Sequence, residues 1–284
     1  MNNFTQVKKQ CIDRFFSRTN PRQREAIYRL NGAVLIIAGA GSGKTTVLCN
    51  RIANMLLFGK SFHTEFERDF SSEDEAFLLS YADGKEENSP ENTARLSRLL
   101  GYERAAPWRI MAVTFTNKAA GELRERLERM NAGGKDVFAG TFHSACVKML
   151  RRGIEELGYK SSFTIYDTDD SLRVIKEVMK YLNISDKAFS PKEFQSKISR
   201  AKDKLITPER FSVFGEGGNF FFNVYYSSDI YTEYQKRLKA ANALDFDDII
   251  MKRVELVEKS GSVLERWQHS VEYVMVDAYH DTNM

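Results

Sequence analysis

The sequence predicts an α/β protein whose core is a parallel sheet, with a second, mainly helical subdomain inserted into that core. The first observation is a set of four short apolar runs typical of buried parallel strands, at residues 33–38, 110–115, 137–142 and 273–277. The second is that helical patterns follow the first three runs. The third is a glycine-rich loop, AGAGSGKTT, which joins the first run to its helix. Together they are typical of a doubly wound sheet.

The two clearest helical patterns each have one apolar face. The helix after the first strand carries Leu48, Ile52, Met55 and Leu56 on that face. The helix after the second strand carries Ala120, Leu123, Leu127 and Met130. We therefore expect both helices to pack against the sheet.

Two segments interrupt the alternation of strand and helix. Residues 61–107 carry 11 acidic and 5 basic side chains and show little periodicity before Leu96, so we expect an inserted, partly mobile surface element that proteases cut first and that lies away from any DNA. Residues 150–240 are mainly helical in pattern and predict an accessory subdomain. The core would then comprise residues 1–149 and 241–284.

Composition limits the classes of protein that fit. Apolar residues make up 42% and charged residues 29% of the chain, which is ordinary for a water-soluble domain. No apolar run reaches the ~18 residues of a membrane helix, and the N-terminus has no signal-peptide pattern. The three cysteines and four histidines show no disulfide or zinc spacing. We therefore expect a cytoplasmic protein without a membrane partner. Residues 108–152 hold 9 basic and 4 acidic side chains, which favours a polyanion partner.

The loop between residues 38 and 48 predicts a phosphate-binding P-loop. Glycines let its backbone curl so that N–H groups face the phosphates. The Lys44 ammonium can reach the β- and γ-phosphates, and the Thr45 hydroxyl can ligate Mg²⁺. The predicted nucleotide-binding residues of this loop are Gly39, Ala40, Gly41, Ser42, Gly43, Lys44, Thr45 and Thr46.

Five further motifs accompany the P-loop in a fixed order. They are NPRQREAI (20–27), MAVTFTNKAAGELRERL (111–127), GTFHSACVKMLRR (140–152), ALDFDDII (243–250) and VDAYHDTN (276–283). In order and spacing they resemble the N-terminal half of the UvrD/PcrA/Rep helicases of superfamily 1. The resemblance covers the chain apart from residues 61–107. It implies a RecA-like ATP-binding core, ATP and Mg²⁺ as cofactors, and a monomer that translocates 3′ to 5′ in DNA repair or replication. Its partners would be single-stranded DNA and a duplex junction.

The resemblance also implies roles for individual side chains. Gln23 would read adenine with its amide, which offers both a donor and an acceptor. The DNA-binding residues would be Phe115, Thr116, Asn117, Lys118, Thr141, Phe142 and His143. Phe115 would stack on a base, with a core position as the alternative, and His143 has a structural hydrogen bond as its alternative. For Asp245, Asp247 and Asp248, near a helix start, we expect a structural network and no metal site.

The last motif departs from the family pattern at two positions. The Mg²⁺-binding aspartate is present as Asp277, but Ala278 stands where the family has the glutamate that activates water, and His280 stands where it has glutamine. Alanine cannot accept a proton, and losing a general base typically costs ~10²–10⁴-fold in rate. The catalytic residues that remain are Lys44 and Asp277. The family's second RecA-like domain, with its arginine fingers, would begin beyond Met284.

Three functions fit these residues to different degrees. The first is the N-terminal region of an ATP-dependent DNA helicase, inactive in hydrolysis as written. The second is a stand-alone, non-hydrolysing, ATP-gated DNA-binding module. The third, a small-molecule P-loop kinase, has no use for the TFTNKAA and TFHS motifs. The first two functions differ only in whether a second domain lies beyond Met284.

Overall fold

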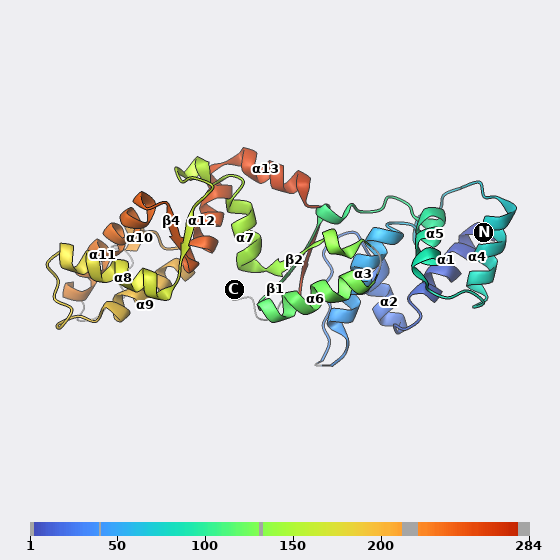
Figure 1. Cartoon of the computed structure of the whole chain (residues 1–284), viewed down its shortest axis with the longest axis horizontal. Helices are drawn as coiled ribbons and strands as arrows, with labels where there is room; N and C mark the ends of the chain where they lie inside the picture. The colour runs from blue at the N-terminus through green and yellow to red at the C-terminus, as the bar shows by residue number, and fades with distance from the viewer. Residues whose placement is uncertain (1–2, 40, 131–132, 212–220, 278–284) are drawn as a thin grey trace. The chain divides into compact units, whose positions relative to one another are not determined.

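The computed structural model describes residues 3–39, 41–130, 133–211 and 221–277 (Figure 1). The chain divides into two compact units. Unit 1 comprises Met1–Phe142 with Gln268–Met284, and unit 2 comprises His143–Trp267. Helix α7 (Phe142–Leu150) and helix α13 (Gly261–Ser270) span the two boundaries. None of the helices described is both long enough and apolar enough to cross a membrane.

Unit 1 is built on a three-stranded parallel sheet. Its strands are β1 (Ile110–Thr114), β2 (Phe138–Thr141) and β5 (Tyr273–Val276), in the order β2-β1-β5. In the register, Ala112 of β1 lies opposite Ala139 of β2 and Met275 of β5. All five residues of β1 are buried, as expected of the central strand. The three predicted strands at 110–115, 137–142 and 273–277 are thus present in an α/β fold.

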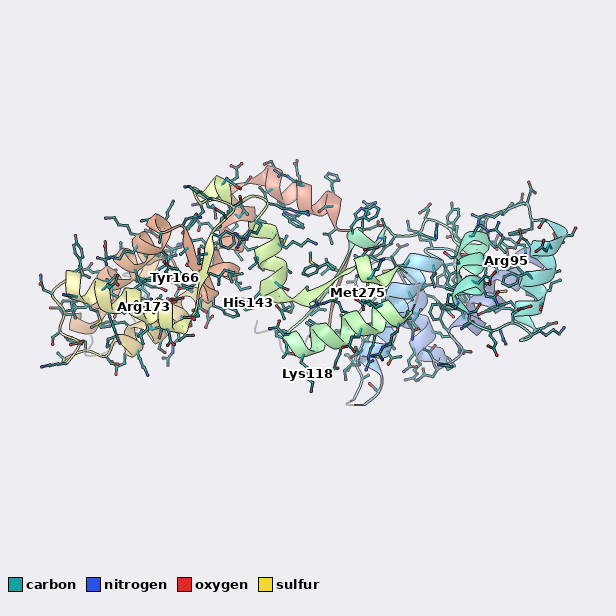
Figure 2. The ribbon with its side chains drawn as sticks, in the orientation of Figure 1. Arg95, Lys118, His143, Tyr166, Arg173 and Met275 are labelled. Carbon is teal, nitrogen blue, oxygen red and sulfur yellow. The ribbon has the colours of Figure 1, made fainter. Side chains whose placement is uncertain are left out.

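Helices α3 (Lys44–Leu57) and α6 (Asn117–Arg129) pack on this sheet, as their apolar faces predict. Ile52 and Met55 of α3 share one core cluster with Leu123 and Leu127 of α6. The same cluster contains Ile110, Ala112, Val137, Ala139 and Met275 from the strands and the turn before β2. Met275 of this cluster is labelled in Figure 2. Helix α3 is therefore fixed at the sheet, with the P-loop at its N-terminus.

The strand predicted at residues 33–38 is absent from the sheet. These residues form no strand and are largely exposed, with 68% of Leu35 and 88% of Ile37 accessible. An apolar run becomes a strand only where its backbone finds a partner, and within the described residues the one strand paired with β5 is β1. The prediction failed because periodicity reports the apolar face of a segment and not the neighbour it needs.

The acidic segment is an ordered part of unit 1, contrary to the expectation of a partly mobile element. It forms α4 (Ser72–Ala82) and α5 (Pro90–Leu100), which Ser71 and Ser89 cap by accepting hydrogen bonds from backbone N–H groups. Both helices bury apolar side chains against α1 (Asn3–Phe15) and the C-terminal turn of α3. Burial of one large apolar side chain stabilises the fold by roughly 1.5–3 kcal/mol. These buried side chains therefore hold the segment in the fold despite its many acidic residues.

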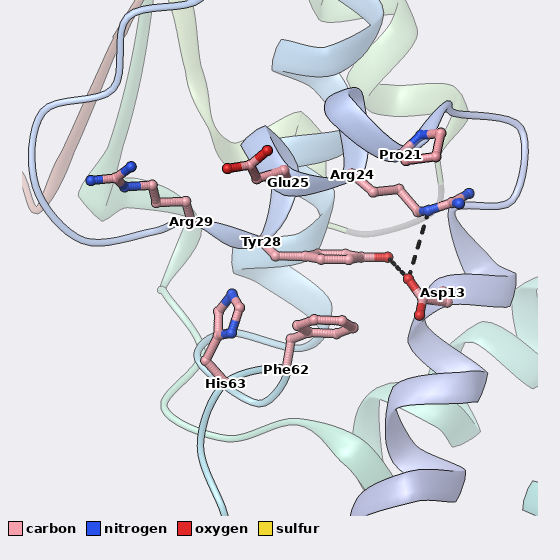
Figure 3. Close-up of a pocket in the computed structure, with 8 residues that line it drawn as sticks. All are labelled: Asp13, Pro21, Arg24, Glu25, Tyr28, Arg29, Phe62 and His63. Atoms are coloured by element: carbon pink, nitrogen blue, oxygen red, sulfur yellow. Dashed lines mark hydrogen bonds and ion pairs between the residues drawn. The ribbon is translucent and has the colours of Figure 1, made fainter.

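Helix α2 (Pro21–Tyr28) links this cluster to the P-loop. Its Tyr28 ring stacks on Phe62, with ring centroids 3.9 Å apart, and the Tyr28 hydroxyl donates to Asp13 at 2.8 Å (Figure 3). Burial and this carboxylate both raise the pKa of Tyr28. These contacts fix α2 between α1 and the loop after α3.

Unit 2 is mainly helical around a two-stranded parallel ladder. Strand β3 (Thr164–Tyr166) pairs with β4 (Ala243–Asp245). The helices are α8 (Thr168–Tyr181), α9 (Pro191–Asp203), α10 (Pro208–Phe211), α11 (Phe221–Ala240) and α12 (Phe246–Lys259). Buried residues of α8, α9 and α11 form its core.

A buried charge network lies beside that core. Lys202 is fully buried, and its Nζ lies 2.5 Å from an Asp245 carboxylate oxygen and 2.9 Å from one of Asp248. Tyr234 donates to Asp245, and Gln235 donates to Asp248. Burial opposes the lysine charge, but the two carboxylates outweigh it and raise the pKa of Lys202. A structural network is what we expected of Asp245 and Asp248.

The two units divide at positions that differ from the expected bounds of 150 and 240. The β3–β4 ladder ties residues 243–245 to residues 164–166, and α12 packs on α9. Residues 241–267 are thereby held in unit 2. Chain order alone does not reveal this, because the ladder joins segments about eighty residues apart.

We expect Lys202→Met to lower the free energy of unfolding by about 3–5 kcal/mol, because it leaves two carboxylates buried without their counter-ion. Urea denaturation measures the change, with Lys192→Met, on the exposed face of the same helix, as the matched control. An equal effect of the two substitutions would show that the network contributes nothing. Because its folded-state pKa lies above the ~10.4 of an unfolded chain, the lysine's contribution should be complete at neutral pH and be lost as pH rises through the folded value.

Candidate functional site

The P-loop backbone has the conformation that its glycines predict. Gly41 has φ 74° and Gly43 has φ 82°, both in the left-handed region that other residues disfavour. Gly43 precedes the first residue of α3, Lys44, so the loop ends at a helix N-terminus. Backbone N–H groups at such a terminus have no partner within the helix and favour anions. Ala40 of the predicted set lies outside the described residues.

Lys44 lies across this loop. Its Nζ donates hydrogen bonds of 2.9 Å to the carbonyl oxygens of Ala38 and Gly39. The ammonium is therefore held close to the loop backbone by weak, exchangeable contacts. A phosphate oxygen would replace these neutral acceptors by a charged one and would pair the ammonium with a counter-ion.

Gln23 contacts the P-loop from helix α2. Its Nε2 donates to the carbonyl oxygen of Ser42 at 3.1 Å, while its Oε1 accepts from the backbone N–H of Asn20 at 2.9 Å. The Asn20 side chain accepts in turn from the Gln23 backbone, which completes a capping box at the start of α2. Sequence reasoning missed Asn20, although an asparagine three residues before a glutamine is the capping-box spacing. The box fixes where the Gln23 amide can reach.

Thr45 and Asp277 meet across the whole length of the chain. The Thr45 hydroxyl donates to Asp277 Oδ2 at 3.2 Å, and 232 positions separate the two residues. The Asp277 backbone N–H donates to the Val113 carbonyl at 2.9 Å, which continues the β1–β5 ladder by one residue. The sheet register thus delivers the carboxylate to the first turn of α3. These are the two residues that the sequence proposes as Mg²⁺ ligands.

The donor set suits a magnesium ion. A hydroxyl and a carboxylate are hard oxygen donors, and Mg²⁺ is usually held by one or two protein groups together with waters and substrate phosphates. The 3.2 Å separation of the two oxygens lets one ion contact both. The residues after Asp277, among them Ala278, His280 and Asp281, lie outside the described part of the chain.

Thr46 follows on the exposed side of α3. Cys49, one turn further along, is buried beneath the site, and burial raises the pKa of its thiol to about 11. It is therefore a neutral thiol at physiological pH and contributes packing.

The predicted DNA-binding residues of unit 1 gather at the ends of β1 and β2. Phe115 is 37% exposed, and its ring centroid lies 5.0 Å from that of Phe142, at an interplanar angle of 51°. Thr116, Asn117 and Lys118 form the exposed start of α6, where Figure 2 labels Lys118. The Thr116 hydroxyl accepts a hydrogen bond from the Ala119 backbone N–H and so caps the helix. Part of its hydrogen-bonding capacity is therefore already used. Thr141 ends β2.

His143 belongs to unit 2 and makes a different contact. Its ring stacks on Phe246, with centroids 3.8 Å apart and planes 19° from parallel. Burial lowers the pKa of His143. Sequence reasoning assigned no role to Phe246, although this residue lies within the ALDFDDII motif.

A separate cavity of about 400 Å³ lies beside α2 (Figure 3). It is lined by Asp13, Pro21, Arg24, Glu25, Tyr28, Arg29, Phe62 and His63. None of these residues belongs to the P-loop or to the predicted nucleotide set. The candidate nucleotide site is therefore an open surface at the start of α3 and not this cavity.

Comparisons with known proteins identify the family of this chain. The sequence pattern of the UvrD/REP helicase N-terminal domain matches residues 19–65 and 93–284. The chain belongs to the UvrD/REP helicase N-terminal domain family. The segment that the family pattern skips, 66–92, contains α4 and the start of α5, and it lies within the insertion expected at 61–107.

Several relatives in this family are named ATP-dependent DNA helicase PcrA. The protein of Bacillus subtilis is 38% identical over 272 residues, which is 95% of this chain and 30% of that protein. The protein of Staphylococcus aureus strain Mu50 is 35% identical over 273 residues, which is 96% of this chain and 31% of its own length. This chain therefore spans about 30% of the length of the curated relatives it matches.

We expect Gly43→Ala to destabilise the P-loop by about 1–2 kcal/mol, because its φ of 82° is unfavourable for any residue with a Cβ. The added Cβ would also lie 3.2 Å from Gln23 Nε2. Gly121→Ala is the matched control, since nothing lies within 4 Å of its Cβ and alanine favours a helix by up to ~1 kcal/mol. The free energy of unfolding, measured by chemical denaturation, should fall for Gly43→Ala and rise for Gly121→Ala. A change in the same direction for both variants would contradict the assignment of strain to the loop.

Proposed function

We propose that this chain is the ATP- and single-stranded-DNA-binding N-terminal region of an ATP-dependent DNA helicase of the UvrD/PcrA/Rep type, and that it does not hydrolyse ATP as written. The observation that carries the proposal is the hydrogen bond between Thr45 and Asp277. It unites a P-loop hydroxyl with the carboxylate at the end of a parallel strand, which is the arrangement that a Mg²⁺-bound nucleotide needs.

Binding of the nucleotide follows from the side chains around that pair. The N-terminus of α3 offers its free N–H groups to the phosphates, and Lys44 turns from the carbonyls of Ala38 and Gly39 to a phosphate oxygen. Gln23 reads the adenine edge while the capping box restrains its backbone. When bound, a magnesium ion held by Thr45 and Asp277 would neutralise phosphate charge. Every one of these groups binds or orients, and none of them removes a proton from water.

The absence of turnover rests on the residue after Asp277. Ala278 occupies the position of the family's water-activating glutamate and has no proton-accepting group. Losing a general base costs ~10²–10⁴-fold, and arginine fingers, which the resemblance assigns to a second RecA-like domain, are worth ~10³–10⁵. Because such groups act together, their contributions to the rate are not additive. We propose that the second domain is a partner required for hydrolysis.

Single-stranded DNA would lie over the ends of β1 and β2. Phe115 and Phe142 are neighbouring rings that directly follow β1 and β2, and the exposed Lys118 lies on the next helix. Aromatic rings stack on bases of any sequence, and lysine side chains neutralise phosphates. The proposed partners are therefore single-stranded DNA and, by resemblance, the duplex junction beside it.

The alternative is a stand-alone DNA-binding module gated by ATP, and Ala278 favours it, because a gate needs binding without hydrolysis. In that case ATP alone should change the affinity of this 284-residue chain for DNA. A helicase fragment that needs its second domain should bind DNA equally with and without nucleotide.

We expect the chain to bind ATP and ADP with Mg²⁺ and to release no phosphate. Calorimetry should show binding in the unchanged protein and its loss in Lys44→Ala, since the ammonium contacts the phosphates. Lys135→Ala, an exposed lysine of the same unit, is the control and should bind normally. Equal affinity in all three proteins would refute the nucleotide site.

A phosphate-release assay on the same samples tests the second half of that prediction. Turnover that disappears in Lys44→Ala would show that another residue serves as the base. Ala278→Glu combined with His280→Gln should restore little in this chain alone. The same pair of changes should restore turnover once a homologous C-terminal half is appended.

We expect weak binding of single-stranded DNA that falls with rising salt, because bound phosphates release counterions. Phe115→Ala should remove roughly 1–3 kcal/mol of binding free energy if a base stacks on this ring. Trp108→Ala is the control, since Trp108 is 74% exposed but lies before β1. Fluorescence anisotropy with a labelled oligonucleotide measures both, and equal losses would argue against a stacking role for Phe115.

A further inference from the structure

The cavity of about 400 Å³ beside α2 has no part in the nucleotide or DNA sites described above (Figure 3). Its volume lies in the range of small-molecule sites. All of its lining residues belong to unit 1, and Gln23, which contacts the Ser42 carbonyl, is not among them. One lining residue, Asp13, precedes the residues that match the family pattern. The cavity is therefore a ligand site to consider separately from the nucleotide.

Apolar and aromatic side chains supply part of the lining. Pro21, Tyr28 and Phe62 line the cavity, and the rings of Tyr28 and Phe62 stack on each other. The His63 ring meets Phe62 edge to face, with centroids 5.1 Å apart and planes at 84°. Aromatic rings add a favourable contact with further rings to the gain from apolar burial. This lining therefore suits an aromatic group.

Two of the charged residues that line the cavity neutralise each other. Asp13 Oδ1 lies 3.7 Å from Arg24 Nε and also accepts the hydrogen bond of the Tyr28 hydroxyl, as the dashed lines in Figure 3 show. Arg24 Nη1 donates to the Thr19 carbonyl at 2.8 Å. These groups have partners within the protein and leave a ligand little charge to pair with.

Glu25 and Arg29 also line the cavity, and both are exposed. In the part of the chain that the structure describes, neither side chain forms an ion pair or a hydrogen bond. The two residues are four positions apart, which lets Glu and Arg pair on a helix. However, α2 ends at Tyr28, and Arg29 has an extended backbone with ψ 92°. The cavity thus has one free carboxylate and one free guanidinium beside its aromatic lining.

We propose that this cavity binds a free aromatic α-amino acid, whose ring packs against Tyr28 and Phe62 while its ammonium pairs with Glu25 and its carboxylate pairs with Arg29. Such a ligand has one aromatic group and two opposite charges, which is the complement of this lining. A guanidinium can hold a carboxylate through two parallel hydrogen bonds. The inference goes beyond the proposed function, since it involves neither nucleotide nor DNA.

Tryptophan and three analogues test the ligand class on the full 284-residue chain, by ligand-observed NMR titration. A ligand of this size should bind tryptophan's site with a Kd of about 1 mM. Tryptamine lacks the carboxylate and indole-3-propionate lacks the ammonium, so each should bind about 1.5- to 5-fold more weakly, the range for one exposed ion pair. Leucine keeps both charges without a ring and should also bind more weakly. The absence of saturable tryptophan binding would overturn the proposal.

Two substitutions that remove a charge assign the contacts. Glu25→Gln should weaken tryptophan binding about 1.5- to 5-fold and should not weaken indole-3-propionate, which has no ammonium. Arg29→Gln should weaken tryptophan to a similar degree and should not weaken tryptamine. Arg22→Gln is the matched control, because Arg22 is an exposed arginine of the same helix that does not line the cavity. Equal losses for Arg22→Gln and Arg29→Gln would overturn the assignment, as would losses that do not depend on the ligand's matching charge.

Further outcomes separate this inference from other occupants and from the proposed function. N-acetyltryptophanamide represents an aromatic residue inside a peptide, and binding as tight as that of tryptophan would overturn the assignment to a free amino acid. Displacement of tryptophan by ATP with Mg²⁺ would assign the ligand to the nucleotide site and overturn the inference. A chain that binds ATP but not tryptophan would overturn this inference alone. A chain that binds tryptophan but neither ATP nor DNA would overturn the proposed function alone.

Discussion

The parallel pairing of β5 with β1 is the constraint on which the candidate nucleotide site depends. Strand β5 comes from the last described residues, and its register on β1 determines how far the carboxylate beyond it reaches. A shift of one residue would turn Asp277 to the other face of the sheet. The bond from the Asp277 N–H to Val113 extends the ladder past the strand itself, and it holds this carboxylate next to Thr45.

Sequence patterns predicted the parts of this fold that depend on local chemistry. The glycine positions of the P-loop, the apolar faces of α3 and α6 and the buried β1 follow from residue type and periodicity alone. The segment at 33–38 did not follow, because a strand also requires a partner and periodicity does not identify one. Likewise, the ladder between β3 and β4 depends on a long-range pairing that moved the boundary of unit 2 away from residue 240.

The candidate site likewise combines contacts that local motifs predict with contacts that depend on long-range packing. The predicted Thr45–Asp277 meeting required only a motif at each end of the chain. The contact of Gln23 with Ser42 required knowledge of the cap that Asn20 provides. The exposure of Phe246 was not predictable from its motif, because whether a strand-end aromatic is buried or exposed depends on how α12 packs against its neighbours. The contact between two motif residues was thus predictable, and contacts that depend on packing were not.

Two segments outside the family pattern pack on one another. Residues 1–18 and 66–92 are both unmatched, yet Cys11 and Ile12 of α1 share a core cluster with Phe77, Leu78 and Tyr81 of α4. The Cys11 thiol donates to the Leu78 carbonyl at 3.3 Å, and Arg14 donates to the Glu86 carbonyl at 2.8 Å. The two segments therefore pack as one structural unit, and each covers apolar surface that the other would expose.

The unpaired run at 33–38 has a consequence for handling the protein. Its backbone N–H and C=O groups form no ladder, and Leu35 and Ile37 face solvent beside a glycine loop; Val274 of β5 is also 63% exposed. Proteins normally protect such edges with charge, proline or a covering element, because an extended apolar segment templates pairing with another chain. Self-association should therefore limit the concentration at which this polypeptide can be studied. Light scattering should rise with protein concentration under conditions in which the helices are still folded.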